Sequence, residues 1–139
     1  MTENKFSTIE RFLAGAGVVT ATTGAFVVSR FNPTKAGFFP VCPLYSVTGI
    51  LCPGCGLTRG FHALFQGDVL TALHFNALLP VYLFFFLYLL LALIFICVRG
   101  RGLKFPAFSP AAIWSLLTVA FVFTVCRNIP FYPFTLLAP

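Results

Sequence analysis

Three long apolar runs constrain the fold of this chain more than any other feature. They cover residues 12–29, 78–98 and 110–126, and each approaches the roughly 17–25 residues that cross a bilayer as a helix. Only 9% of the 139 residues are charged, whereas 59% are hydrophobic, and so few charges cannot cover the surface of a soluble domain. The sequence therefore predicts an all-α integral membrane protein, with a single membrane domain over residues 1–139 and three transmembrane helices.

The first apolar run carries small residues at a regular spacing. Gly17, Ala21 and Ala25 recur every four positions, which lets a neighbouring helix approach closely. The neighbour is either another helix of the same chain or the same helix of a second copy. The expected partners are the lipid bilayer and other membrane proteins or a homo-oligomer. The net charge of +6 comes from Lys and Arg scattered beside the apolar runs, which is typical of head-group anchors and excludes a nucleic-acid partner.

The basic residues also predict an orientation. Arg99, Arg101 and Lys104 form a compact basic loop between the second and third runs, and such loops stay in the cytoplasm. The N-terminus then lies in the cytoplasm and the cysteine motif on the outer face. The end of the third helix, at Arg127 and Asn128, shares that face, so the two most polar clusters of the chain come together.

Three of the five cysteines crowd into the polar segment 40–75 between the first two helices. Cys42 precedes the pair Cys52 and Cys55, and cysteines two residues apart can chelate a metal, close a disulfide or exchange electrons. Two short helices are expected after the motif, over residues 57–65 and 69–75, with Asp68 as the N-cap of the second. The segment is thus expected to be an interfacial or re-entrant helical hairpin.

A metal site is the first interpretation of the motif. The turn Cys-Pro-x-Cys-Gly resembles the turns of zinc ribbons and rubredoxin-like sites, in which backbone N–H groups point at thiolate sulfurs. A tetrahedral ion needs four ligands. Cys42, Cys52 and Cys55 supply three, and His62 is the candidate for the fourth, with zinc or iron as the metal.

A disulfide and a packing turn are the two other interpretations. Cys42 can pair with Cys52 or Cys55, or the last two can act as a catalytic dithiol activated by the N-terminus of the following helix. In a packing turn, the prolines and glycines only let backbone approach backbone, and Arg59 pairs with Asp68 or hydrogen-bonds the carbonyl end of a helix.

The motif resembles a family of small bacterial membrane proteins catalogued as domain of unknown function 2752. The resemblance covers residues 40–130. It is carried by Cys42-Pro43, Thr48-Gly49, Cys52-Pro53-Gly54-Cys55-Gly56-Leu57-Thr58-Arg59, Gly67-Asp68, Asn76 and Arg127-Asn128. The chain has Asn76-Ala77-Leu78 where the family commonly has Asn-Pro-Leu. The resemblance implies a bacterial inner membrane protein and supplies no established activity. Structural polar roles are expected for Thr58, Arg59, Asp68, Asn76, Arg127 and Asn128.

The sequence favours a non-enzymatic function, because it shows no Ser-His-Asp set, phosphate-binding glycine loop or carboxylate pair. The preferred hypothesis is an accessory or scaffold subunit whose cysteine segment is a rigid docking element held by a disulfide or a metal. One alternative is a membrane thiol-disulfide oxidoreductase that uses Cys52 and Cys55. The other is a metal-handling protein or oligomeric transporter with a hydrated path lined by His62, Asp68 and His74.

Overall fold

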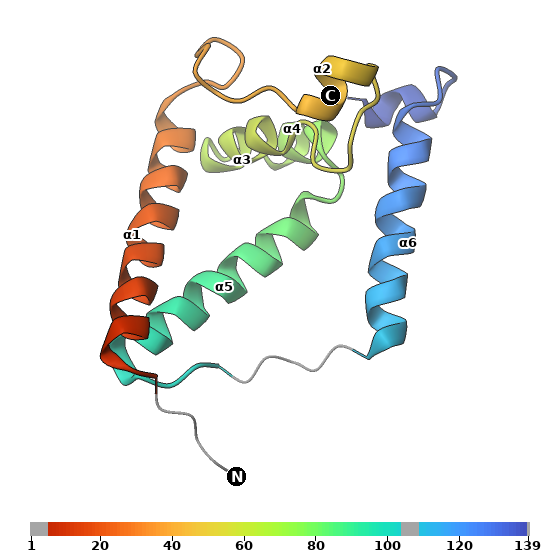
Figure 1. The fold of residues 1–139 in the computed structure, drawn as a ribbon. Coiled ribbons are helices and arrows are strands. Elements are labelled where there is room, and N and C mark those ends of the chain that lie inside the picture. The colour runs from red at the N-terminus through yellow and green to blue at the C-terminus, as the bar shows by residue number, and fades with distance from the viewer. Residues whose placement is uncertain (1–5, 104–108, 139) are drawn as a thin grey trace. The chain divides into compact units, whose positions relative to one another are not determined.

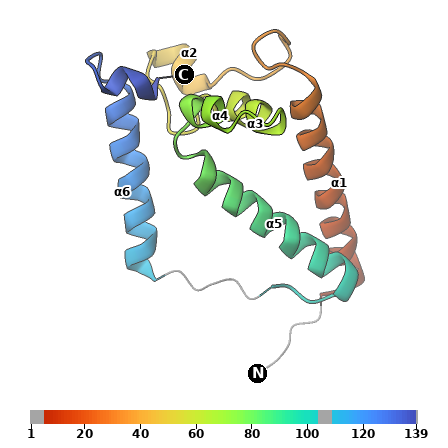
Figure 2. The ribbon, with the colours of Figure 1, turned by 180° about the vertical axis from the view of Figure 1, so that it is seen from behind.

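A computed structural model describes residues 6–103 and 109–138 of the chain, and all regular elements in these residues are helical. Figures 1 and 2 show them from opposite sides. In chain order they are α1 (Thr8–Arg30), α2 (Pro43–Thr48), α3 (Leu57–Phe65), α4 (Val69–Phe75), α5 (Leu79–Arg99), α6 (Pro110–Arg127) and the 3₁₀-helix η1 (Phe134–Leu137). The all-α prediction is confirmed. Lys104, which the sequence analysis placed in a basic loop, lies outside the described residues.

Three of these helices are long and apolar enough to cross a membrane. The most apolar windows of α1, α5 and α6 have mean hydropathies of 1.6, 3.0 and 1.6. The cysteine segment lies between the first and second of them, as expected.

Side-chain caps set the start of two of these helices. α1 begins before the apolar run because Ser7 and Glu10 form reciprocal hydrogen bonds. The Ser7 N–H donates to the Glu10 carboxylate at 2.7 Å, and the Glu10 N–H donates to the Ser7 hydroxyl at 3.3 Å, which is the capping-box arrangement. α6 begins after Ser109, whose hydroxyl accepts from the Ala112 N–H at 3.3 Å, as the sequence predicts.

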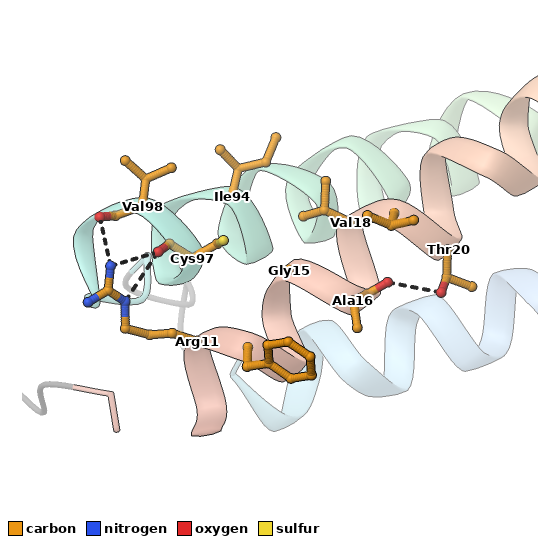
Figure 3. Close-up of a pocket in the computed structure, with 10 residues that line it drawn as sticks. Arg11, Gly15, Ala16, Val18, Thr20, Ile94, Cys97 and Val98 are labelled. Atoms are coloured by element: carbon orange, nitrogen blue, oxygen red, sulfur yellow. Dashed lines mark hydrogen bonds between the residues drawn. The ribbon is translucent and has the colours of Figure 1, made fainter. Parts of the chain in front are cut away.

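The chain divides into two compact units, and the first comprises the described residues of 1–27 and 80–106. Here the Arg11 guanidinium on α1 donates to the Cys97 carbonyl at 3.0 and 3.2 Å and to the Val98 carbonyl at 3.3 Å (Figure 3). A Cβ on Gly17 would lie 3.2 Å from a methyl of Leu93. At this position, the small-residue face of α1 therefore contacts α5 of the same chain.

The second unit comprises the described residues of 28–79 and 107–139 and contains the cysteine segment. Its centre is the hairpin of α3 and α4, which lie side by side (Figures 1 and 2). The core consists of Ala63, Ala72 and Leu79. Gly60 permits this packing, because a Cβ there would lie 2.6 Å from a Leu79 methyl and 3.1 Å from the Ala72 carbonyl oxygen.

The turn between α3 and α4 uses the residues that the sequence analysis singled out. Gly67 has a φ of +86°, a conformation that glycine adopts without steric cost. The Asp68 carboxylate then accepts from the Thr71 N–H at 3.0 Å, so the predicted N-cap is confirmed. The Thr71 side chain, together with this backbone N–H, lowers the pKa of Asp68 from its ordinary value of 3.8.

Candidate metal centre

Three cysteines from two parts of the second unit lie together. Cys42 directly precedes α2, and Cys52 and Cys55 belong to the turn before α3. The Cys52 Sγ lies 3.4 Å from the Cys42 Sγ and 3.1 Å from the Cys55 Sγ, and all three sulfurs lie within 4.8 Å of one another. Cys55 is buried, whereas Cys42 and Cys52 are half-buried. The structure thus forms the three-sulfur cluster on which the metal interpretation depends.

The backbone between the paired cysteines forms a tight turn. The Cys55 N–H donates to the Cys52 carbonyl at 3.1 Å, and the Leu57 N–H donates to the Gly54 carbonyl at 3.1 Å. Gly56 follows with a φ of +80° and begins α3. Within the turn, the Cys52 N–H points at the Cys55 Sγ at 3.2 Å. This is the kind of N–H to sulfur contact that the proline and glycine spacing predicts.

Arg127, at the end of α6, holds the cysteine turn through its carbonyl groups. Its side chain is only 2% exposed. The guanidinium donates to the carbonyls of Cys52 at 3.3 Å, Cys55 at 2.9 Å and Phe75 at 3.2 Å, and it lies 5.0 Å from the centre of the Phe123 ring. A buried charge is tolerated only where polar groups or opposite charges compensate it. Carbonyl dipoles from the cysteine turn and from the end of α4 provide that compensation.

Asn76 holds the same turn from the end of α4. It is 0% exposed, and its Nδ2 donates to the carbonyls of Pro53 at 2.9 Å and Cys55 at 3.2 Å. Its Oδ1 accepts from the Leu78 N–H at 2.9 Å. Every atom of the amide thus has a role in fixing the turn against α4.

Asn128 fixes the approach to the turn. Its side chain accepts from the Leu51 N–H at 2.9 Å and donates to the Leu51 carbonyl at 3.0 Å, while a second bond to the Thr124 carbonyl at 2.8 Å closes the end of α6. The predicted meeting of the cysteine segment with the Arg127-Asn128 cluster is confirmed. Through the Phe75 carbonyl, Arg127 also contacts the C-terminal end of α4.

The thiols of the cluster differ in acidity. Burial raises the pKa of the Cys55 thiol to about 12, and its hydrogen bond with Cys52 acts in the same direction. The backbone N–H of Tyr45 lowers the pKa of Cys42, with a further contribution from the Cys52 thiol. In the metal-free cluster, Cys42 is therefore more acidic than Cys55, and Cys55 is protonated at neutral pH.

His62 and the cysteines occupy separate environments. The His62 Nδ1 lies 2.7 Å from the Val28 carbonyl oxygen, and the cluster of mutually close ligand atoms found in the described residues contains the three cysteines without His62. Thr58 and Arg59 are exposed on α3. The structure therefore brings the three cysteines together with Asn76, Arg127 and Asn128, and places Thr58, Arg59, His62 and Asp68 outside the cluster.

The sulfur geometry is close to what a single metal ion requires. With metal–sulfur bonds of about 2.3 Å, three sulfurs of a tetrahedron lie roughly 3.8 Å apart. The two closest pairs here lie at 3.1 and 3.4 Å, so small side-chain rotations reach the ligated arrangement. The three cysteines leave the fourth position of the tetrahedron to a water molecule or another ligand.

The first unit contains a groove of different character. It has a volume of about 790 Å³, and its lining includes Arg11, Gly15, Val19, Ile94 and Cys97 (Figure 3). The lining is mainly aliphatic, and the Arg11 guanidinium is hydrogen-bonded to carbonyls at the end of α5. The groove offers an apolar surface, whereas the cysteine cluster offers metal-binding chemistry.

A family model described as a protein of unknown function (DUF2752) matches residues 42–96. Over this segment, referred to as the DUF2752 segment, the chain is similar to that family. The resemblance inferred from the motif is thereby confirmed over residues 42–96, whereas its expected continuation to residue 130 is not matched. The DUF2752 segment includes all three clustered cysteines and Asn76, whereas Arg127 and Asn128 lie beyond its end. No curated protein and no solved structure matches the chain.

Proposed function

We propose that Cys42, Cys52 and Cys55 hold one metal ion, zinc or iron, and that the metal makes the cysteine segment a rigid element of a small membrane-embedded accessory or scaffold subunit. The observation that carries the proposal is the gathering of three sulfurs within 4.8 Å. One of them comes from a residue ten positions before the turn. Thiolates are the ligands that zinc and iron prefer in such sites.

The number of the sulfurs supports a metal over thiol exchange. A disulfide joins two of the three sulfurs and leaves the third beside it, whereas a metal engages all three. An exchanger also needs an attacking sulfur that a substrate can reach, and this role is left to the half-buried Cys42 or Cys52 because Cys55 is only 9% exposed. Cys52 has a neighbouring sulfur on each side, so a disulfide to Cys42 or Cys55 is the competing outcome of the test.

The membrane setting completes the proposal. We place the protein in a bacterial inner membrane with the N-terminus in the cytoplasm and the cysteine segment on the outer face, because Arg99 ends α5 and Arg101 follows two residues later, and short basic loops stay inside. The spanning helices expose large apolar side chains such as Phe12, Phe84 and Phe121. These surfaces suit lipid and the helices of partner proteins.

Local roles of the remaining polar residues weigh against transport. The path suggested by the sequence would be lined by His62, Asp68 and His74. His62 is engaged with the Val28 carbonyl at 2.7 Å, and Asp68 caps α4. The proposal therefore stays with a structural metal.

Metal content and thiol reactivity of the full chain test this proposal. The protein is purified in mild detergent without chelator, alongside Cys42→Ser, Cys52→Ser and Cys55→Ser variants, with Cys97→Ser as the matched control from the other unit. We expect about one metal per chain in the wild type and in Cys97→Ser, and loss of metal in each of the three cluster variants. A metal-free wild type in which two of the cluster thiols resist alkylation until they are reduced would show a disulfide in place of the metal site.

A further inference from the structure

The guanidinium of Arg127 lies directly against the backbone of two cluster cysteines. It is 2% exposed and donates to the carbonyls of Cys52 and Cys55 at 3.3 and 2.9 Å. A guanidinium stays protonated at any physiological pH. One permanent positive charge is therefore fixed against the backbone of the turn that carries two of the three sulfurs.

The positive charge of Arg127 determines which metal ion makes the site, counted as the ion, three thiolates and the guanidinium, electrically neutral. Metal-bound cysteines are thiolates, so the three ligands carry three negative charges. A divalent ion together with Arg127 balances them, whereas a monovalent ion such as Cu⁺ leaves one negative charge in a partly buried site. Uncompensated charge is costly where water is largely excluded. Thiolates are soft ligands that bind both Zn²⁺ and Cu⁺, so the net charge of the occupied site is what distinguishes the two ions.

We propose that Arg127 is the charge-balancing positioning residue of this centre and that it selects a divalent thiophilic ion over a monovalent one. The inference rests on the proposed three-thiolate site. Asn76 provides the contrast, because its amide holds the same turn through Pro53 and Cys55 and carries no charge. Arg127 affects both the position of the ligands and their charge balance, whereas Asn76 affects position alone.

Competition titrations with chromogenic chelators separate the two effects. The affinities of the full-length protein for Zn²⁺ and Cu⁺ are measured in detergent for the wild type, Arg127→Gln, Arg127→Lys and Asn76→Ala. Lys35→Gln is the control, because it removes an exposed charge from the same unit. We expect Arg127→Gln to weaken Zn²⁺ binding roughly 10–100-fold and Cu⁺ binding much less. Arg127→Lys should keep most of the preference for Zn²⁺.

The controls define what overturns the inference. Asn76→Ala should weaken both ions by a similar factor, and Lys35→Gln should change neither. Equal losses of both ions in Arg127→Gln would reduce Arg127 to a structural residue and overturn the inference, as would unchanged affinities. If Arg127→Gln does not fold, the Arg127→Lys and Asn76→Ala variants test the inference instead. A changed ratio of Zn²⁺ to Cu⁺ affinity in Asn76→Ala would contradict the inference, as would loss of the preference for Zn²⁺ in Arg127→Lys. A wild type that binds neither ion refutes the metal site itself.

Discussion

Alanine at Gly60 should destabilise the α3–α4 hairpin although alanine is the better helix former. The added Cβ would lie 2.6 Å from a methyl of Leu79, which is itself only 2% exposed, and 3.1 Å from the Ala72 carbonyl oxygen. Overpacking of this kind costs about 1–3 kcal/mol, and the helix preference of alanine returns about 0.5–1 kcal/mol. The expected net loss in the free energy of unfolding is roughly 0–2.5 kcal/mol, with a central value of about 1 kcal/mol.

The same strain should reach the cysteine turn. α3 begins two residues after Cys55, and Asn76 at the end of α4 holds the Cys55 carbonyl, so separating the two helices pulls on that bond. The assay is a denaturant titration in detergent followed by circular dichroism, together with the alkylation rate of the cluster thiols. Gly24→Ala in α1 is the matched control, because a Cβ there meets nothing within 4 Å, and it should not lower stability. A Gly60→Ala protein as stable as Gly24→Ala, with thiols alkylated at the wild-type rate, would refute the close approach.

Two further perturbations test the polar contacts of the second unit. Asn76→Ala leaves the Pro53 and Cys55 carbonyls without its amide, and we expect a loss of about 1–3 kcal/mol and faster alkylation of Cys55, with unchanged alkylation kinetics as the contrary result. The pKa of Asp68 is lowered by its bond to Thr71, so its contribution to stability is present above its unfolded pKa and is lost as the pH falls through the folded value. Thermal unfolding should show this loss below about pH 4 in the wild type and not in Asp68→Asn, and superimposable pH profiles of the two proteins would contradict it.

Local signals in the sequence predicted most of the elements of this fold. The apolar runs predict the three membrane-competent helices, because hydrophobic length is a property of each segment by itself. Gly67 and Asp68 predict the turn and cap between α3 and α4 for the same reason. The start of α1 before the apolar run could have been predicted from the sequence, because Ser7 and Glu10 have the capping-box spacing.

The supports of the site were harder to predict, because they join distant parts of the chain. Arg127 reaches carbonyls 75 and 72 residues earlier, and no local pattern specifies such a partner. The alternation of spanning helices predicted that the cysteine segment and the Arg127-Asn128 cluster lie on the same face of the membrane. It did not predict that Asn76 and Arg127 both bind the Cys55 carbonyl. His62 was the candidate for the fourth ligand because a tetrahedral ion needs four, whereas tertiary structure places its imidazole at the Val28 carbonyl.

X-ray absorption at the metal edge of the full-length protein tests the central claim most directly, because it counts the sulfur atoms bound to the ion. The three-cysteine centre predicts three sulfur neighbours at about 2.3 Å and one lighter atom in the open position. Each of Cys42→Ser, Cys52→Ser and Cys55→Ser should remove one sulfur or the metal itself. A metal surrounded by nitrogen and oxygen atoms alone, or a wild-type protein that binds no metal, would contradict the claim that the three cysteines form one metal centre.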